Sequence, residues 1–288
     1  PSEIAPQPGR GLTGAPATPQ IMPKLAANIS MLFTEQPFLK RFALAARCGF
    51  RAVECLFPYS EDPRALKAAL ERSELQQALF NAPPGDFEAG ERGIGALPGR
   101  EDEFKFSIEQ ALTYAELTKC ARLHVMAGLA SGGAREDVFV PNLRWAADAA
   151  ASVGVTVCVE ALNPTDFPGY LVGDTATAAR LVAEVGHSRC AHQFDLYHHA
   201  MTEGSGAALL EAAVREYAPA AAHVQIANPP ARNEPGVGDV DFHPLLELLD
   251  EVGYKGHIGC EYKPSTTTMA SLGWAERYGV SAAEEVGG

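Results

Sequence analysis

The stretch from residue 155 to residue 196 decides the fold, and it reads VTVCVEALNPTDFPGYLVGDTATAARLVAEVGHSRCAHQFDL. Its two ends, 155–161 and 190–196, are short apolar runs rich in residues that favour β-strands. Between them, residues 174–185 show the spacing of an amphipathic helix, which begins at Asp174 as a helix cap and ends at Gly186. A strand, a helix and a second strand in this order predict a βαβ unit with parallel strands.

The same alternation continues on both sides of this unit. Strand-like runs occupy residues 24–29, 51–57, 75–81, 121–127, 155–161, 190–196, 221–227 and 257–262. Helix-like segments occupy residues 37–48, 62–73, 101–118, 135–152, 174–185, 204–217 and 242–252, with a further one at 269–278. Eight alternating pairs favour an α/β fold of the closed (β/α)₈ type, a single TIM barrel, over an open sheet.

The first 23 residues differ from the rest of the chain. They contain six prolines and three glycines and show no periodicity, which predicts a flexible tail. We therefore expect a tail over residues 1–23 and one barrel domain over residues 24–288. Two connections, 82–100 after the third strand and 163–170 after the fifth, are rich in glycine or proline and are candidate lids, because active sites of barrels form on that side.

Composition excludes several classes of function. The 288 residues carry 23 Lys and Arg against 36 Asp and Glu, a formal net charge of −13, and no basic run is present. This balance disfavours nucleic-acid and anionic membrane partners.

No apolar stretch is long enough to cross a membrane and no secretory signal is evident, so we expect a cytoplasmic protein. The six cysteines form no CxxC pair, and we expect them to be buried and free. No nucleotide-binding motif lies between a strand and a helix, so no nucleotide cofactor is indicated.

Polar residues stand at or near the end of every strand-like run. They are Asn28, Glu54, Asn81, His124, Glu160, Asp195, Gln225 and Glu261. In a barrel the carboxyl ends of the strands converge on one mouth, so these side chains are predicted to meet there. A salt bridge or hydrogen bond between strands explains the presence of any one of them. Carboxylates buried on several consecutive strands require a further explanation, because a buried carboxylate without a partner is costly.

The last four strands supply an all-oxygen set, namely Glu160, Asp195, Gln225 and Glu261. Three carboxylates in a ring repel one another unless a cation lies between them. Oxygen ligands favour Mg²⁺ or Mn²⁺ over Zn²⁺, and the two ions cannot be told apart from this set. The pattern predicts a divalent metal that acts as a Lewis acid on adjacent carbonyl and hydroxyl oxygens of a substrate.

Four further residues are candidates for substrate binding. His198 lies three residues after Asp195 and is expected to hydrogen-bond a substrate oxygen, whereas its neighbour His199 is expected at the surface. Arg232 follows the seventh strand, where a guanidinium suits a substrate carboxylate, although this residue taken alone favours a solvated loop charge.

The remaining two candidates, His124 and Asn81, are either substrate-binding residues or core residues with satisfied hydrogen bonds. Glu54 lies early in the chain, and we expect it to pair with Lys24 or Lys263.

Several long segments resemble the hydroxypyruvate isomerase family, a branch of the xylose-isomerase-like barrels. They are ANISMLFTEQPFLKRF, CGFRAVECLFPY, LFNAPPGDFEAGERGIGALPGRE, HVMAG, VEALNP, FDLYH, AHVQIANPPARNEPGVGDVDF and GCEYKPSTTT. The resemblance extends from Lys24 to about Tyr278. It implies a (β/α)₈ fold, a divalent metal, and the interconversion of hydroxypyruvate and tartronate semialdehyde (2-hydroxy-3-oxopropanoate). The loop after HVMAG is shorter than is usual in the family, and the tail has no counterpart there.

The resemblance also implies roles for single residues. The metal ligands of the family fall on Glu160, Asp195, Gln225 and Glu261, and its catalytic glutamates fall on Glu160 and Glu261. Related ketose epimerases place a histidine and an arginine at the positions of His198 and Arg232. The partner implied is a small hydroxy-oxo acid, and a homo-oligomer is possible.

Other functions remain open at this point. Close relatives isomerise 2-oxo-tetronates, and others epimerise ketoses on the same kind of metal site. More distant barrels cleave abasic DNA with several zinc ions, which the charge of −13 and the lack of further histidine ligands disfavour. A catalytically inactive barrel that binds a metabolite is the alternative outside the enzymes.

Overall fold

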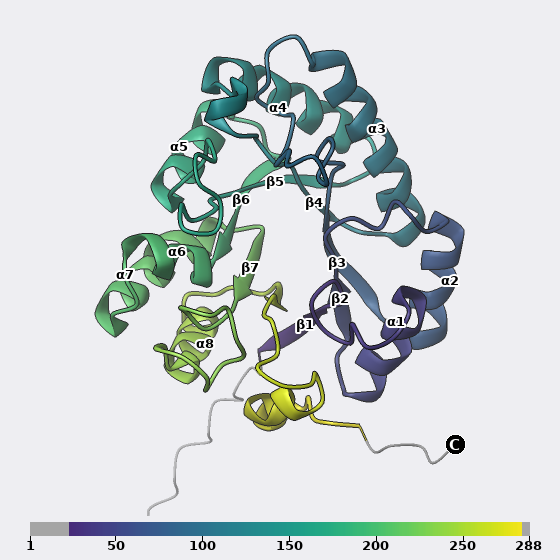
Figure 1. Ribbon diagram of the computed structural model, residues 1–288, viewed down its shortest axis with the longest axis vertical. Coiled ribbons are helices and arrows are strands. Elements are labelled where there is room, and N and C mark those ends of the chain that lie inside the picture. Colours follow the sequence, from purple (N-terminus) through teal and green to yellow (C-terminus); the bar gives the residue numbers. More distant parts are fainter. Residues whose placement is uncertain (1–22, 284–288) are drawn as a thin grey trace, which may run out of the picture.

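A computed structural model describes residues 23–283 of the chain. Eight parallel strands close into a barrel in chain order, β1 to β8, and the last strand pairs with the first. The helices surround the barrel on the outside (Figure 1). The predicted (β/α)₈ fold is confirmed. The tail was predicted over residues 1–23, and residues 1–22 lie outside the described part of the chain.

The strands are short, and most of their residues are buried. Their bounds are β1 Lys24–Asn28, β2 Ala52–Glu54, β3 Gln76–Asn81, β4 Arg122–His124, β5 Thr156–Glu160, β6 Cys190–Asp195, β7 His223–Ile226 and β8 His257–Cys260. The first six strands end on the polar residues that the sequence analysis singled out. Gln225 lies one residue before the end of β7, and Glu261 follows β8 directly.

The described residues form eight α-helices and three 3₁₀ helices, the last of which follows β8. The α-helices are α1 Phe38–Arg47, α2 Pro63–Ser73, α3 Glu101–Thr118, α4 Glu136–Ala151, α5 Thr175–Val185, α6 Leu196–Glu203, α7 Ala207–Tyr217 and α8 Phe242–Glu251. The 3₁₀ helices are η1 Ala130–Gly132, η2 Ala218–Ala220 and η3 Ala270–Tyr278. No helix among residues 23–283 is long and apolar enough to cross a membrane.

Helix α6 was not predicted. It begins at Leu196, directly after β6, because the side chain of Asp195 caps it by accepting a hydrogen bond of 2.8 Å from the backbone N–H of Tyr197. Its sequence, LYHHAMTE, has no clear apolar stripe, since its first five residues are all buried. This early start brings His198 into the first turn of a helix at the mouth of the barrel.

The main apolar core lies between the strands and the surrounding helices, as in other barrels. All six cysteines are free and buried, as predicted. Inside the barrel, Ala26, Ala52 and Ala78 form a separate small cluster. Because side chains alternate along a strand, Asn28 and Glu54 project to the same side as Ala26 and Ala52, one step nearer the mouth. The small alanines therefore lie below a polar layer.

The long connection at 82–100 folds back over the mouth of the barrel. It pairs with the chain after β4 through an isolated bridge between Gly93 and Ala127. Gly93 has φ +109°, and a Cβ there would lie 2.4 Å from the backbone of Met126, so only glycine fits this close approach. At its other end, Arg100 forms ion pairs with Glu91 and Glu103. These contacts fix the loop against the barrel.

Two phenylalanines of α3 provide a matched test of this packing. The Phe104 side chain is 1% exposed, whereas that of Phe106 is 68% exposed. We expect Phe104→Ala to lower the free energy of unfolding by about 3–5 kcal/mol, because it leaves a cavity in the core. Phe106→Ala should change it by less than about 0.5 kcal/mol. Urea denaturation measures both variants, and equal effects would contradict this packing.

Candidate active site

A cavity of about 60 Å³ opens at the carboxyl ends of the strands. Six of the predicted site residues line it, namely Asn81, His124, Glu160, His198, Arg232 and Glu261. Its other walls are mostly apolar, supplied by Met31, Leu56, Phe57, Phe87, Met126, Leu162 and Phe167, together with the amide of Gln193. A few convergent polar groups in an apolar pocket are typical of a site for a small ligand.

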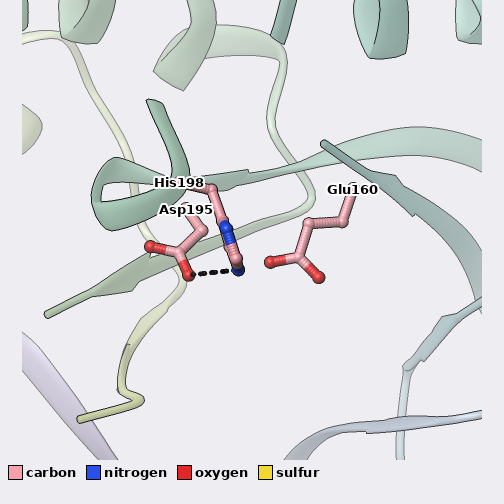
Figure 2. Close-up of side chains that lie close together, drawn as sticks. All are labelled: Glu160, Asp195 and His198. Atoms are coloured by element: carbon pink, nitrogen blue, oxygen red, sulfur yellow. Dashed lines mark ion pairs between the residues drawn. The ribbon is translucent and has the colours of Figure 1, made fainter. Parts of the chain in front are cut away.

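Three side chains meet beside this cavity, of which Glu160 and His198 line it and Asp195 does not. Glu160 at the end of β5, Asp195 at the end of β6 and His198 in α6 each offer a ligand atom, and these atoms lie within 4.8 Å of one another (Figure 2). All three residues are buried. Glu160 Oε1 and Asp195 Oδ2 have no hydrogen-bond partner among the described residues. Buried carboxylate oxygens without partners are costly, so this geometry favours a cation or a proton between them.

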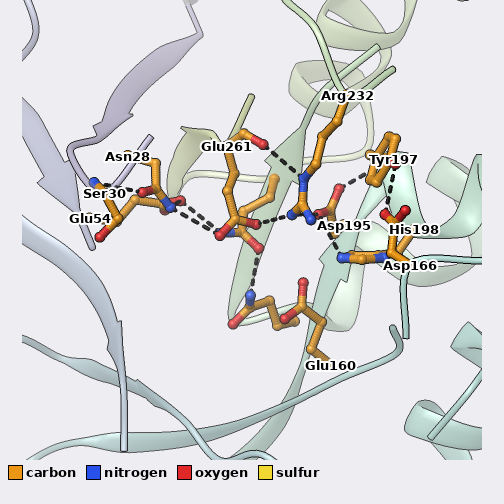
Figure 3. Close-up of polar contacts among 12 residues, drawn as sticks. Asn28, Ser30, Glu54, Glu160, Asp166, Asp195, Tyr197, His198, Arg232 and Glu261 are labelled. Atoms are coloured by element: carbon orange, nitrogen blue, oxygen red, sulfur yellow. Dashed lines mark hydrogen bonds and ion pairs between the residues drawn. The ribbon is translucent and has the colours of Figure 1, made fainter. Parts of the chain in front are cut away.

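Arg232 joins two of the predicted ligands. Its Nη2 lies 2.7 Å from Glu261 Oε2 and 3.6 Å from Asp195 Oδ2 (Figure 3). The residue is 8% exposed, so the alternative of a solvated loop charge is wrong. Its backbone φ is +60°, a conformation that costs energy for a residue with a side chain and that is found preferentially at functional sites.

Glu54 forms a second polar layer beneath the cavity. Its Oε2 accepts from His223 Nε2 at 2.5 Å, and its Oε1 accepts from Gln225 Nε2 at 2.7 Å and from Asn28 Nδ2 at 3.1 Å. The expected pairing of Glu54 with Lys24 or Lys263 is therefore wrong. Closure of the barrel brings Glu54 on β2 next to side chains of β1 and β7. Which side chains meet there depends on the register of the strands and not on their separation along the chain.

The fourth predicted ligand, Gln225, takes part in this lower layer. Its Nε2 donates to Glu54, and its Oε1 accepts a short hydrogen bond from Gln193 Nε2. The hydrogen bonds of the described residues do not join Gln225 to Glu160 or Asp195. Asn28 connects the two layers, because its Nδ2 also donates to Glu261 Oε1 at 3.0 Å.

The loop after β5 determines which ring nitrogen of His198 carries the proton. The backbone N–H of Asn163 donates to His198 Nδ1 at 3.0 Å. Burial lowers the pKa of His198 well below its usual range, so the ring is neutral. A neutral imidazole that accepts at Nδ1 carries its proton on Nε2. His198 is therefore suited to donate a hydrogen bond to a ligand through Nε2.

Burial shifts the pKa values of the other titratable groups of the cavity. It raises the pKa of Glu261 to about 8 and that of Asp195 to about 6. Burial, together with Glu261 and Asp195, raises the pKa of Glu160 well above its usual range. Burial lowers the pKa of His124 to about 3, so this ring is neutral where its Nδ1 lies 3.4 Å from Glu160 Oε2. The cavity thus disfavours uncompensated negative charge.

Sequence reasoning also missed several residues near the cavity. His199 is buried and not at the surface, and its Nδ1 lies 2.9 Å from Thr175 Oγ1. Gln193 lies two residues before Asp195 on the same strand, so the alternation of side chains was a signal that it points inward. Asn163 and Tyr197, in contrast, contact site residues only because a loop and an unpredicted helix meet there.

Comparison with known proteins places the chain in a family. Residues 42–278 match the family described as xylose isomerase-like TIM barrel. The chain belongs to this family. The resemblance to the hydroxypyruvate isomerase branch is confirmed by relatives that cover most of the chain.

Two curated relatives and one solved structure illustrate the similarity. The 2-oxo-tetronate isomerase of Cupriavidus necator is 47% identical over 89% of this chain and 99% of its own length. The hydroxypyruvate isomerase of Escherichia coli is 38% identical over 89% of this chain and 100% of its own length. A crystal structure described as an AP endonuclease of family 2 from Brucella melitensis superimposes with a TM-score of 0.84 at 43% identity, over 89% of this chain and 99% of that one. The curated names support an isomerase.

The packing around Glu54 gives a prediction for β8. A Cβ added to Gly259 would lie 2.3 Å from Glu54 Oε2. Gly259→Ala should therefore displace this carboxylate and lower the free energy of unfolding by about 1–3 kcal/mol. Gly273→Ala is the matched control, because a Cβ there meets nothing within 4 Å. Urea denaturation of both variants is the test, and an unaffected Gly259→Ala protein would contradict this placement of Glu54.

Proposed function

We propose that the protein isomerises a short 2-oxo acid that carries a hydroxyl group on C3, with hydroxypyruvate and tartronate semialdehyde as the predicted pair. The observation that carries this proposal is the cavity itself. It combines buried carboxylates, suited to proton transfer between neighbouring carbons, with one guanidinium, that of Arg232, among the described residues that line it. A single cationic side chain suits a substrate with one carboxylate and no phosphate group.

A second candidate substrate is 2-oxo-tetronate. The specific observation in its favour is that the Cupriavidus necator enzyme of that name is 47% identical to this chain, against 38% for the Escherichia coli hydroxypyruvate isomerase. The four-carbon acid adds one carbon beyond C3 and leaves the reacting C2 and C3 positions unchanged. Both substrates therefore require the same catalytic groups and differ only in the space needed beyond C3.

A divalent ion, Mg²⁺ or Mn²⁺, is proposed as the cofactor. One oxygen each of Glu160 and Asp195 has no hydrogen bond and fits such an ion, and Glu261 shares an ion pair to Arg232 with Asp195. The predicted fourth ligand is the amide oxygen of Gln225. When bound, the ion supplies Lewis-acid chemistry that stabilises negative charge on the substrate oxygens.

The chain's own residues carry the remaining steps. Arg232 holds the substrate carboxylate, and His198 donates a hydrogen bond from Nε2 to a substrate oxygen. One glutamate, Glu160 or Glu261, removes a proton from C3, and the electron pair of that C–H bond forms an enediolate. The proton of the C3 hydroxyl passes to the C2 oxygen and a proton returns to C2, which gives the aldehyde, so the atoms and charges of substrate and product balance. His124 and Asn81 line the cavity and are proposed to contact the substrate.

An abasic-site endonuclease is the function suggested by the Brucella melitensis structure. Barrels that cleave abasic DNA use several zinc ions, whereas only one group of three His, Cys, Asp or Glu side chains among the described residues is arranged to hold a metal ion. The chain also carries a formal net charge of −13, which opposes DNA binding. We therefore favour the isomerase.

The two glutamates provide the first test. Glu261→Gln and Glu160→Gln preserve side-chain size but remove the carboxylate, so each should lower kcat for hydroxypyruvate by about 10³-fold or more. Glu109→Gln, at an exposed position on α3, is the control and should retain full activity. Steady-state kinetics with circular dichroism of each variant measures this. Full activity in Glu261→Gln protein with native secondary structure would contradict the role of that residue.

Metal removal provides the second test. Protein treated with a chelator should lose activity, and Mg²⁺ or Mn²⁺ should restore it. The restored protein is assayed in parallel with hydroxypyruvate, 2-oxo-tetronate and a duplex that contains an abasic site. A higher kcat/KM for hydroxypyruvate supports the predicted substrate, and a higher value for 2-oxo-tetronate supports the second candidate. Cleavage of the duplex without turnover of either acid would contradict the isomerase.

A further inference from the structure

We propose that Asp166 and Tyr197 form a positioning pair that holds Arg232 and His198 in place for a carboxylate ligand. This inference rests on the proposed function, in which these two side chains bind substrate oxygens. Neither member of the pair lines the cavity, so neither is a catalytic residue. The pair connects the loop at 163–170 with the first turn of α6 (Figure 3).

One carboxylate oxygen of Asp166 accepts two hydrogen bonds. The Tyr197 hydroxyl donates to Asp166 Oδ2 at 2.8 Å, and Asn163 Nδ2 donates to the same oxygen at 3.1 Å. The loop is itself ordered by Asn163, whose Oδ1 accepts from the backbone N–H groups of Thr165 and Asp166. Asp166 is exposed, and these hydrogen bonds hold its carboxylate between the loop and Tyr197.

Tyr197 transmits this position to Arg232. The guanidinium carbon of Arg232 lies 4.8 Å from the centroid of the Tyr197 ring, within the range of a cation–π contact. The ring is held at two points, because the backbone N–H of Tyr197 donates to Asp195 and the hydroxyl donates to Asp166. The ion-pair partners of Arg232, Glu261 and Asp195, are proposed metal ligands, whereas the Tyr197 ring is not.

The other branch of the pair reaches His198. Asn163 contacts His198 Nδ1 both through its backbone N–H, at 3.0 Å, and through Nδ2, at 2.8 Å. Asp166 accepts from this same Nδ2, which fixes the orientation of the Asn163 amide. A shift of Asp166 would therefore move the hydrogen-bond donors of both proposed substrate contacts, on His198 and on Arg232.

The test is a double-mutant cycle with Asp166→Asn, Tyr197→Phe and the double variant. Tyr278→Phe is the matched control, because the Tyr278 hydroxyl also contacts a side chain, that of His243, but outside the cavity. Calorimetry measures the Kd of glycerate, a carboxylate that cannot isomerise, and the Kd of Mn²⁺ for each protein. Steady-state kinetics separates KM from kcat for hydroxypyruvate.

Each single variant should raise the Kd of glycerate and the KM about tenfold, with kcat within about twofold and the Kd of Mn²⁺ unchanged. The double variant should be no worse than Asp166→Asn alone, because the one bond that Tyr197→Phe removes is a bond to Asp166. Additive effects, or an unchanged Kd of glycerate, would overturn the inference. A loss of glycerate affinity that only parallels a lower unfolding midpoint would also overturn it, because general destabilisation would then explain the loss.

The wild-type protein separates this inference from the proposed function. If the wild type neither binds glycerate nor turns over hydroxypyruvate or 2-oxo-tetronate, the proposed function fails and the role of the pair fails with it. If the wild type binds glycerate and the three variants of the cycle bind it equally well, the pair has no positioning role and the proposed function stands.

Discussion

The burial of negative charge inside the barrel is the constraint on which the rest of the structure depends. Four carboxylates are buried at the carboxyl ends of the strands, those of Glu54, Glu160, Asp195 and Glu261, while Arg232 is the buried guanidinium beside them. Fully ionised, this set carries −4 + 1 = −3 charges in a medium where isolated ions are unstable. The fold can hold it only with further protons, a cation, or both, and a divalent cation is the choice that also has a chemical use.

The barrel tolerates this charge by arranging it in two layers. In the lower layer, Glu54 is satisfied by donors from His223, Gln225 and Asn28. In the upper layer, one oxygen of Glu160 and one of Asp195 lack a hydrogen-bond partner among the described residues. Both oxygens of the lower carboxylate, Glu54, are therefore hydrogen-bonded without a ligand, although Nδ1 of its partner His223 is not. Each of the two upper carboxylates, in contrast, keeps one oxygen without a hydrogen bond. This difference separates a structural network from a candidate site more clearly than burial does, because both layers are equally buried.

The periodic alternation of the sequence predicted all eight strands and the polar residue at or beside each carboxyl end, because both depend on local patterns. It missed α6, since Asp195 both ends a strand and caps the helix that follows. It also assigned the wrong partners to Glu54, because contacts across the barrel depend on register and closure. The burial of His199 and of Arg232 was not predicted, because it depends on the packing of α6 and of the loops. The substrate remains a proposal, since one added carbon changes none of the reacting groups.

Binding of Mn²⁺ to the chelator-treated protein tests the central claim most directly. Calorimetry should find one ion per chain at the buried carboxylates, and Asp195→Asn should weaken its affinity at least about tenfold, because it removes one anionic ligand. The exposed control Asp102→Asn on α3 should bind as the wild type does. Absence of binding, or equal affinity in Asp195→Asn, would contradict a metal site at the mouth of the barrel.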